Sequence, residues 1–518
     1  MTIDRRTFLT ITGLGAAGAV LARQTSLTAA APPAFDLDEI TLGELQEGLR
    51  SGRLTSRAVT EAYLARIDAI DKRGPAINAV IEINPDALAI AQEMDRASTR
   101  RGALHGIPVL IKDNIDTADR MHTSAGSLAL ADSIAPRDSA VAKKLREAGA
   151  VIIGKTNLSE WANFRSTHST SGWSGRGGQT KNPYVLDRNP CGSSSGTGAA
   201  IAANLAAAGV GTETDGSVVC PSSACGLVGI KPTLGLISGA GIVPIAHSQD
   251  TAGPMCRTVT DAAILLGALS EKPRDDTKSL DADGLRGARI GVARKYFGIN
   301  DSTDALMKHA IDVIKQLGAT IIDPADMATT GKYDETEQEV LLFEFKHDLN
   351  QYLGRLGLNV KTRTLADLIK FNEQNRDREM PYFGQELFEK AEKKGPLTEE
   401  KYKKALARNH RMSRTEGIDA VLKKHKLDAI IAPTGGPVWP TDLINGDHYT
   451  GGYSTASAVA GYPHITVPAG LAFGLPVGLS FFAGAWSEPT LIKLAYAFEQ
   501  ATKARKRPAF LPAVRLQA

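Results

Sequence analysis

The stretch from Cys191 to Cys225 constrains the fold of this chain more than any other part of its 518 residues. It opens with a loop in which three serines stand between Gly192 and Gly196. An alanine-dense run from Gly198 to Ala208 follows, and only Asn204 interrupts its apolar character. A run that is apolar on all sides predicts a helix buried inside a large core.

A second turn in the same stretch carries one more serine. A short extended piece from Gly209 to Thr214 leads into Asp215-Gly216, and this turn presents Ser217. Two serine-bearing turns therefore stand at neighbouring ends of a buried helix and a strand. This arrangement is typical of a reactive site, because functional side chains are usually carried by loops on rigid elements.

The residues alone leave other interpretations of the serine loop open. Glycine- and serine-rich stretches are often flexible linkers, although a buried helix is not what usually follows a linker. A phosphate-binding loop needs a lysine after its second glycine, and none follows Gly196 or Gly198. The nucleophile elbow of the α/β-hydrolases has a near match at 192–196, but it requires a downstream acid and histidine.

The wording of the motifs resembles the amidase signature family. The serine loop is followed by GTETDGSVVCPSSACGLVGIKPT and GLISGAGIVPIAHSQDTAGPMCRTV, and GIPVLIKDNIDT lies upstream. Further on, GYPHITVPAG and LPVGLSFFAG are similar to the C-terminal core strands of the family. The resemblance runs from about Thr41 to about Lys506, and RGGQTKNP and TETDGS are most similar to the bacterial peptide amidases within the family.

This resemblance implies an α/β fold, with a mixed β-sheet core covered by helices on both faces in one large domain. It also implies a Ser–Ser–Lys triad that hydrolyses amides without a metal or a cofactor. By position, Ser217 is the nucleophile, Ser193 the bridging serine and Lys112 the base. The family further implies a cis peptide bond between Gly192 and Ser193.

The triad is chemically reasonable if Lys112 is buried. A serine hydroxyl is a weak nucleophile and needs an adjacent base. Lysine can act as that base only when neutral, and burial lowers its pKa. Lys112 ends an apolar strand that starts at Gly106. The residues alone favour a solvated strand end here, and the family resemblance favours the buried base.

The substrate-binding residues are expected around the second turn. Successive backbone N–H groups in a tight turn can hold an oxyanion, which points to Thr214, Asp215, Gly216 and Ser217. Asp215 departs from the glycine that is commoner in the family. The small-residue loop 122–127, which ends at Ser127, is expected to line the site.

Strands and helices alternate along the rest of the chain, which supports the α/β class. We expect a helix capped by Ser139, a strand at 151–154 and a helix capped by Ser302. The charged segment 332–426 has long helical periodicity and predicts a helical insertion that borders the substrate entrance. The rigid loop 433–437 is suited to a cleft wall.

Composition excludes several other classes of protein. Apolar residues make up 42% of the chain and charged residues 23%, as in ordinary globular proteins, and the formal net charge is +3. This charge gives no reason to expect nucleic acid or a stable membrane association. The four cysteines show no metal-ligand spacing. Three of them, Cys191, Cys220 and Cys225, lie in the central stretch, and we expect these to be small buried residues near the site rather than bridged. We also expect a monomer.

The N-terminus has the pattern of an export signal. Asp4-Arg5-Arg6-Thr7-Phe8-Leu9 is a twin-arginine pattern, and an apolar run too short to span a membrane follows it. We expect residues 1–31 to be the signal peptide and 32–518 the amidase domain. A periplasmic or secreted location follows from this assignment.

The expected reaction is deamidation of the C-terminal carboxamide of peptides, and a broad amidase acting on aliphatic or aromatic amides is the alternative. An amidotransferase subunit shares the fold, but its partners are cytosolic. A non-catalytic amide-binding protein would be expected to have lost a triad residue. A Ser-His-Asp hydrolase would have to use His122, His168 or His247, the histidines nearest the motifs.

Overall fold

The structure is a computed structural model that describes residues 35–514. The predicted signal peptide therefore lies outside the described residues. From Leu37 onward the chain forms one compact unit. No helix in the described part of the chain combines the length and the apolar character needed to cross a membrane.

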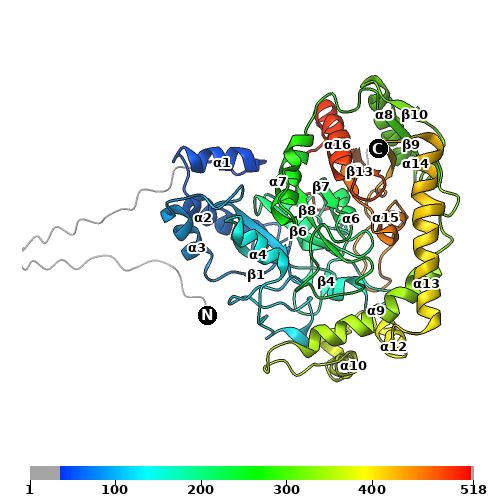
Figure 1. The fold of residues 1–518 in the computed structure, drawn as a ribbon. Helices are drawn as coiled ribbons and strands as arrows, with labels where there is room; N and C mark the ends of the chain where they lie inside the picture. Colours follow the sequence, from blue (N-terminus) through cyan, green and yellow to red (C-terminus); the bar gives the residue numbers. More distant parts are fainter. Residues whose placement is uncertain (1–34, 515–518) are drawn as a thin grey trace, which may run out of the picture. The chain divides into compact units, whose positions relative to one another are not determined.

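The core of this unit is a mixed sheet of eleven strands (Figure 1). Across the sheet the strands are β1 (Val80–Ile83), β3 (Val151–Thr156), β2 (Pro108–Lys112), β6 (Ala208–Glu213), β8 (Thr251–Cys256), β7 (Val228–Lys231), β12 (His464–Ala472), β13 (Leu475–Phe482), β11 (Ala429–Pro433), β9 (Arg289–Val292) and β10 (Thr320–Ile322). β2 runs parallel to β3 and β6, whereas β6 and β8 are antiparallel. The predicted α/β class with a mixed sheet is confirmed.

Helices flank the sheet (Figure 1). Outside the insertion they are α1 (Leu42–Arg50), α2 (Ser56–Arg66), α3 (Ala87–Arg96), α4 (Ala140–Glu147), α5 (Ser195–Ala202), α6 (Val219–Ala224), α7 (Val259–Leu269), α8 (Asp301–Gln316), α15 (Thr455–Ala460) and α16 (Glu488–Thr502). Short helical pieces are η1 (Ile67–Lys72), η2 (Leu128–Leu130), η3 (Glu160–Asn163), η4 (Asp276–Ser279), η5 (Arg294–Tyr296) and η6 (Arg411–Ile418), and β4 (Trp173–Ser174) pairs with β5 (Gly178–Gln179).

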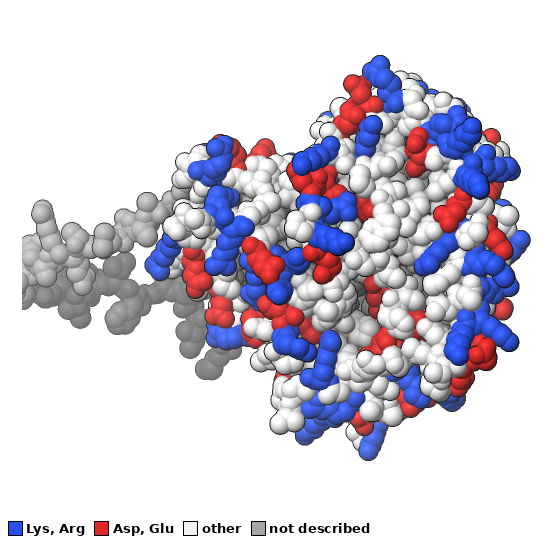
Figure 2. Space-filling model, viewed as in Figure 1, with Lys and Arg blue, Asp and Glu red and all other residues white. Residues whose placement is uncertain are grey.

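The charged segment is helical, as its periodicity predicts. It contains α9 (Asp334–Gly354), α10 (Leu365–Gln374), α11 (Arg376–Glu379), α12 (Glu386–Glu392), α13 (Glu400–His410) and α14 (Asp419–His425). Its apolar side packs on the core through an aromatic cluster in which Phe345 lies against Phe164 and Phe388 against Trp161, with ring centroids 5.0 and 6.0 Å apart. On the face shown in Figure 2, basic and acidic side chains are interspersed.

Two predicted helix boundaries differ from the structure. Ser139 caps α4 as expected, but α8 is capped by Asn300, whose side chain accepts from the Thr303 N–H, and Ser302 lies inside the first turn. Asparagine caps as well as serine does, so the helix starts earlier.

The central buried helix also starts and ends earlier than the apolar run suggests. α5 covers Ser195–Ala202, and the left-handed backbone of Asn204 (φ 58°) turns the chain towards β6. Every residue of α5 is buried. A Cβ at Gly196 would lie 2.3 Å from the Ala79 carbonyl oxygen, so only glycine allows this close approach.

Candidate active site

Lys112 is a buried base candidate at the carboxyl end of β2. β2 and β6 are parallel neighbours, so their carboxyl ends meet at one edge of the sheet. The Lys112 Nζ donates to the Thr212 hydroxyl at 2.9 Å and to the Thr212 carbonyl at 3.3 Å. Its side chain is 0% exposed. Burial lowers the pKa of Lys112 to about 7, although the carboxylates of Asp250 and Glu213 oppose the shift.

Of the three clustered serines, Ser193 is the one that faces the lysine. The Lys112 Nζ donates to the Ser193 Oγ at 2.8 Å. The Ser194 hydroxyl donates to the Thr212 carbonyl at 3.0 Å, and the Ser195 hydroxyl donates to the Cys191 carbonyl at 2.6 Å. Ser194 and Ser195 therefore hold the loop, whereas Ser193 is available for proton transfer. The Gly192–Ser193 peptide bond is cis, as the family resemblance predicts.

Ser217 lies beside this loop in the turn between β6 and α6. The Ser194 N–H donates to the Ser217 carbonyl at 3.2 Å, which ties the two serine-bearing turns together. Ser217 is 8% exposed. Within residues 35–514 its hydroxyl forms no hydrogen bond, so no protein group occupies the oxygen.

The turn around Ser217 presents a row of free backbone donors. In the described chain, none of the N–H groups from Thr214 to Ser217 donates to a protein acceptor. The next two N–H groups, of Val218 and Val219, are taken by the Glu213 carboxylate at 2.8 and 3.1 Å. Gly216 has φ 78°, a conformation that favours glycine. The turn can therefore serve as an oxyanion nest.

A disulfide links the start of the serine loop to the first turn of α6, which follows the Ser217 turn. Cys191 and Cys220 are bonded, with Cα atoms 6.0 Å apart and a sequence separation of 29. The expectation that the three central cysteines are unbridged is therefore wrong for Cys191 and Cys220. The fold brings the start of the serine loop against the first turn of α6, a proximity that sequence spacing does not reveal. Cys225 is free and buried, as expected, and Cys256 is free and buried as well.

A cavity of about 390 Å³ opens onto both turns. It is lined by Gly192, Asp215 and Gly216 from the turns. Its other walls are residues of the segments 163–171 and 439–455, including Trp439. The cleft wall thus lies further along the chain than the predicted loop 433–437. Trp173 is not among the residues that line the cavity, and it packs on Phe383 at a centroid distance of 5.2 Å.

Ser127, which was expected near the substrate, does not line this cavity. Its hydroxyl donates to the Glu379 carboxylate at 3.1 Å and accepts from the Ala129 N–H at 3.2 Å. It is fully buried and is not among the residues that line the cavity. In this structure Ser127 joins the 122–127 loop to α11 of the insertion.

Several residues that sequence reasoning missed support the turns. Asn114 donates to the Thr212 hydroxyl at 3.0 Å. The Thr214 hydroxyl donates to Asp250 at 2.6 Å, and Gln249 donates to the Thr214 carbonyl at 3.2 Å. Burial raises the pKa of Asp250 to about 7. These contacts depend on the pairing of β6 with β2 and with β8, so no local signal in the sequence identifies them.

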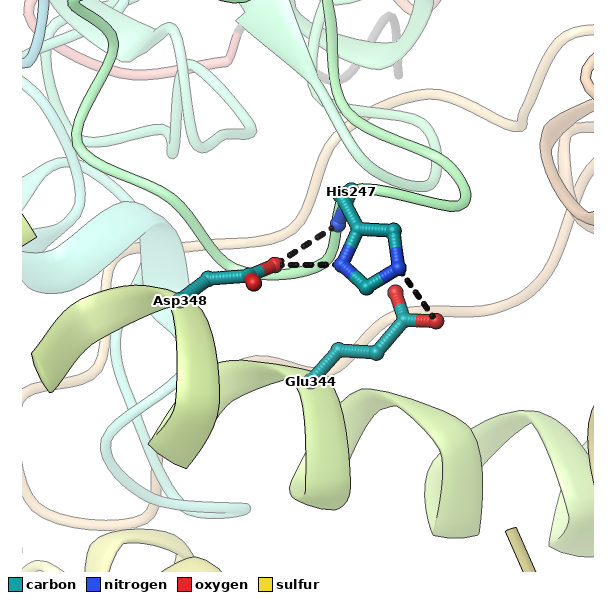
Figure 3. A group of neighbouring side chains, drawn as sticks. All are labelled: His247, Glu344 and Asp348. Atoms are coloured by element: carbon teal, nitrogen blue, oxygen red, sulfur yellow. Dashed lines mark hydrogen bonds and ion pairs between the residues drawn. The ribbon is translucent and has the colours of Figure 1, made fainter. Parts of the chain in front are cut away.

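Two of the three histidines near the motifs, His122 and His247, are engaged with carboxylates, and the backbone N–H of the third, His168, donates to the Ser166 hydroxyl at 3.0 Å. His247 lies between Asp348 and Glu344 of α9 (Figure 3), with Nδ1 2.7 Å from Asp348 Oδ2 and Nε2 3.5 Å from Glu344 Oε1. The Nδ1 of His122 lies 2.9 Å from Glu82. Both ring nitrogens of His247 thus face acids rather than a serine, which disfavours a Ser-His-Asp site there.

Comparison with known proteins agrees with this geometry. A family model described as Amidase matches residues 58–492. The solved structure of native peptide amidase from Stenotrophomonas maltophilia is 47% identical, with a TM-score of 0.86, and the match covers 92% of this chain and 100% of that one. A probable amidase of Arabidopsis thaliana is 43% identical over 92% of this chain and 93% of its own length. A glutamyl-tRNA(Gln) amidotransferase subunit from Thermoanaerobacter pseudethanolicus is 33% identical over 92% and 99%.

The chain belongs to the amidase signature family. It is an amide hydrolase of that family, with the fold of its peptide amidase structures.

Proposed function

We propose that this protein is a peptide amidase that converts the C-terminal carboxamide of a peptide into a carboxylate and ammonia. In the proposed triad, Ser217 is the nucleophile, Ser193 the bridging serine and Lys112 the base. The observation that carries the proposal is the buried Lys112, whose Nζ lies 2.8 Å from the Ser193 Oγ. With a pKa near 7, much of this lysine is neutral at neutral pH.

The reaction begins with proton transfer. Neutral Lys112 takes the proton of the Ser193 hydroxyl, while Ser193 takes the proton of Ser217, since a hydroxyl both donates and accepts. The Ser217 oxygen attacks the amide carbon, and the carbonyl electron pair moves onto the oxygen. The free N–H groups from Thr214 to Ser217 stabilise this oxyanion.

The second half of the reaction releases the products. The proton returns through Ser193 to the amide nitrogen, the carbon–nitrogen bond breaks, and ammonia leaves an acyl-enzyme on Ser217. Water then attacks the ester with the same base, which restores the serine and frees the carboxylate.

Two observations support a carboxamide rather than a free acid as substrate. The cavity that opens onto the turns is lined by no lysine or arginine among the described residues, so a free C-terminal carboxylate would find no cationic partner there. The 47% identity with a peptide amidase also favours this reaction.

The experiment compares a peptide amide, the same peptide as a free acid, and a simple aromatic amide. We expect ammonia from the peptide amide alone. Equal turnover of the aromatic amide would indicate a broad amidase. Internal cleavage of the free acid would contradict the proposal.

The proposed roles predict that alanine variants of the three serines lose turnover to different degrees. Ser217→Ala should lower turnover by on the order of 10³-fold or more, because members of a catalytic unit fail together, and Ser193→Ala should cost less. Ser194→Ala is the matched control, because its hydroxyl bonds to Thr212 rather than to Lys112. A Ser194→Ala variant as inactive as Ser217→Ala would contradict the roles assigned.

A further inference from the structure

The active-site cavity carries acidic charge and no basic charge. Among the described residues that line it, the charged side chains are Asp215 and Asp447. Asp215 stands between two residues of the oxyanion nest, so a substrate whose carbonyl is held by the nest passes directly beside its carboxylate. The cavity therefore presents negative potential to the part of the substrate nearest the reacting amide.

Neither carboxylate forms an ion pair within the described chain. Asp447 accepts from the Ser171 N–H at 3.0 Å, from the indole of Trp439 at 3.0 Å and from Asn189 at 3.3 Å, all neutral donors. Asp215 accepts from the Thr455 hydroxyl at 2.7 Å through one oxygen. Its other oxygen, Oδ1, has no partner among the described residues.

Further acidic groups lie behind Asp215. Burial raises the pKa of the Asp215 carboxyl, and the charge of Asp334, in the first turn of α9, raises it too, whereas its hydrogen bonds and the charge of the buried Lys231 lower it. Burial raises the pKa of Glu337, a buried acid of the same turn, and the charge of Asp215 raises it further. Carboxylates that form no ion pair in a partly buried site are costly unless a cation arrives with the ligand.

The mouth of the cavity adds aromatic rings. Trp439 and Tyr449 meet edge to face, with ring centroids 5.8 Å apart. Tyr449 is 52% exposed, so a substrate can reach its ring. Acidic groups combined with aromatic faces are the usual environment for an ammonium or a guanidinium.

We propose that this cavity binds a cationic group of the substrate, and that the preferred substrates are amides with a positive charge near the carboxamide, with Asp215 as the specificity-determining contact. The inference rests on the proposed amide hydrolysis and adds the substrate class. A cation would neutralise carboxylates that the protein leaves unpaired, whereas an acidic side chain would meet like charge.

The test uses three N-acetylated peptide amides that differ only in the residue carrying the carboxamide: lysine, norleucine or glutamate. Ammonia release at pH 8 and low ionic strength gives kcat/KM for each. We expect lysine to exceed norleucine, and norleucine to exceed glutamate, with each step about tenfold. Added salt should reduce the differences in kcat/KM among the three amides.

Variants then assign the effect to the cavity. In Asp215→Asn the ratio of lysine to glutamate should fall by about tenfold, whatever happens to the absolute rate, and Asp447→Asn should lower the same ratio. Asp442→Asn is the matched control, since Asp442 lies on the same segment but not in the cavity lining, and it should keep the wild-type ratio.

The outcomes separate the two proposals. Equal turnover of all three amides by the wild-type protein would overturn this inference and leave the amidase function standing. An unchanged ratio in both Asp215→Asn and Asp447→Asn would also overturn it. No ammonia from any of the amides would contradict the proposed function itself.

Discussion

Lys112 should set the lower pH limit of activity. As the base it must be neutral, so kcat/KM should rise through about pH 7, the pKa that burial gives this lysine. Asp250→Asn removes a carboxylate that raises this pKa, so the midpoint of the rise should move to lower pH. A profile whose midpoint is the same in wild type and in Asp250→Asn would contradict the electrostatic coupling.

Lys112→Met should separate activity from stability. The pKa of Lys112 is about 7 in the folded state against 10.5 ordinarily, so the unfolded chain binds more protons between these values. The buried lysine therefore costs stability below pH 7, and the cost disappears as the pH rises towards 10.5. Lys112→Met should abolish turnover but raise Tm by about one degree at pH 7, or about 1 kcal/mol. The gain should be smaller at pH 10, and a lower Tm at pH 7 would contradict the argument.

The Cys191–Cys220 disulfide holds two elements in register, the serine loop before α5 and the first turn of α6. Thiol titration of the denatured, unreduced protein should count two free cysteines, because Cys225 and Cys256 are unbonded. A loop of this length contributes about 3–4 kcal/mol in the chain-entropy estimate. Cys191→Ala combined with Cys220→Ala should lower the free energy of unfolding by a similar amount. A count of four thiols would exclude the bridge.

His247 fastens α9 to the segment that supports the nucleophile turn. The hydrogen bond to Asp348 raises the pKa of His247. The stabilisation should therefore be complete below the ordinary pKa of histidine and be lost as the pH rises through the raised value. His247→Gln should lower Tm more at pH 6 than at pH 9 and retain activity.

The control for this contact is His448→Gln, since His448 is an exposed histidine that lies 3.6 Å from Asp442. It should change Tm little at either pH. Lost activity with intact folding in His247→Gln would revive the Ser-His-Asp alternative.

The fold of the whole molecule was largely predictable, since strand and helix periodicities identify the α/β class and the charged insertion. The triad candidates Lys112, Ser193 and Ser217 could be identified because the sequence motifs around them resemble those of the amidase signature family. Thr212, Asn114 and Asp250 could not be predicted, because their roles depend on which strands pair across long sequence separations. The disulfide was missed for the same reason, since only the packing of the serine loop on α6 brings Cys191 to Cys220.

Export of the whole protein by its twin-arginine leader stays a prediction. Replacing Arg5 and Arg6 together by lysine should keep the protein in the cytoplasm, because the export machinery reads the arginine pair. Cell fractionation measures this directly. Normal export of the double variant would contradict the twin-arginine assignment.

The central claim is that Ser217 is the nucleophile, activated through Ser193 by Lys112. A serine-directed fluorophosphonate, followed by peptide mapping in a mass spectrometer, tests it most directly. The label should appear on Ser217, form more slowly as the pH falls below about 7, and be absent from Ser217→Ala. A label on Ser193 or on another serine, or unchanged labelling in Lys112→Met, would contradict it.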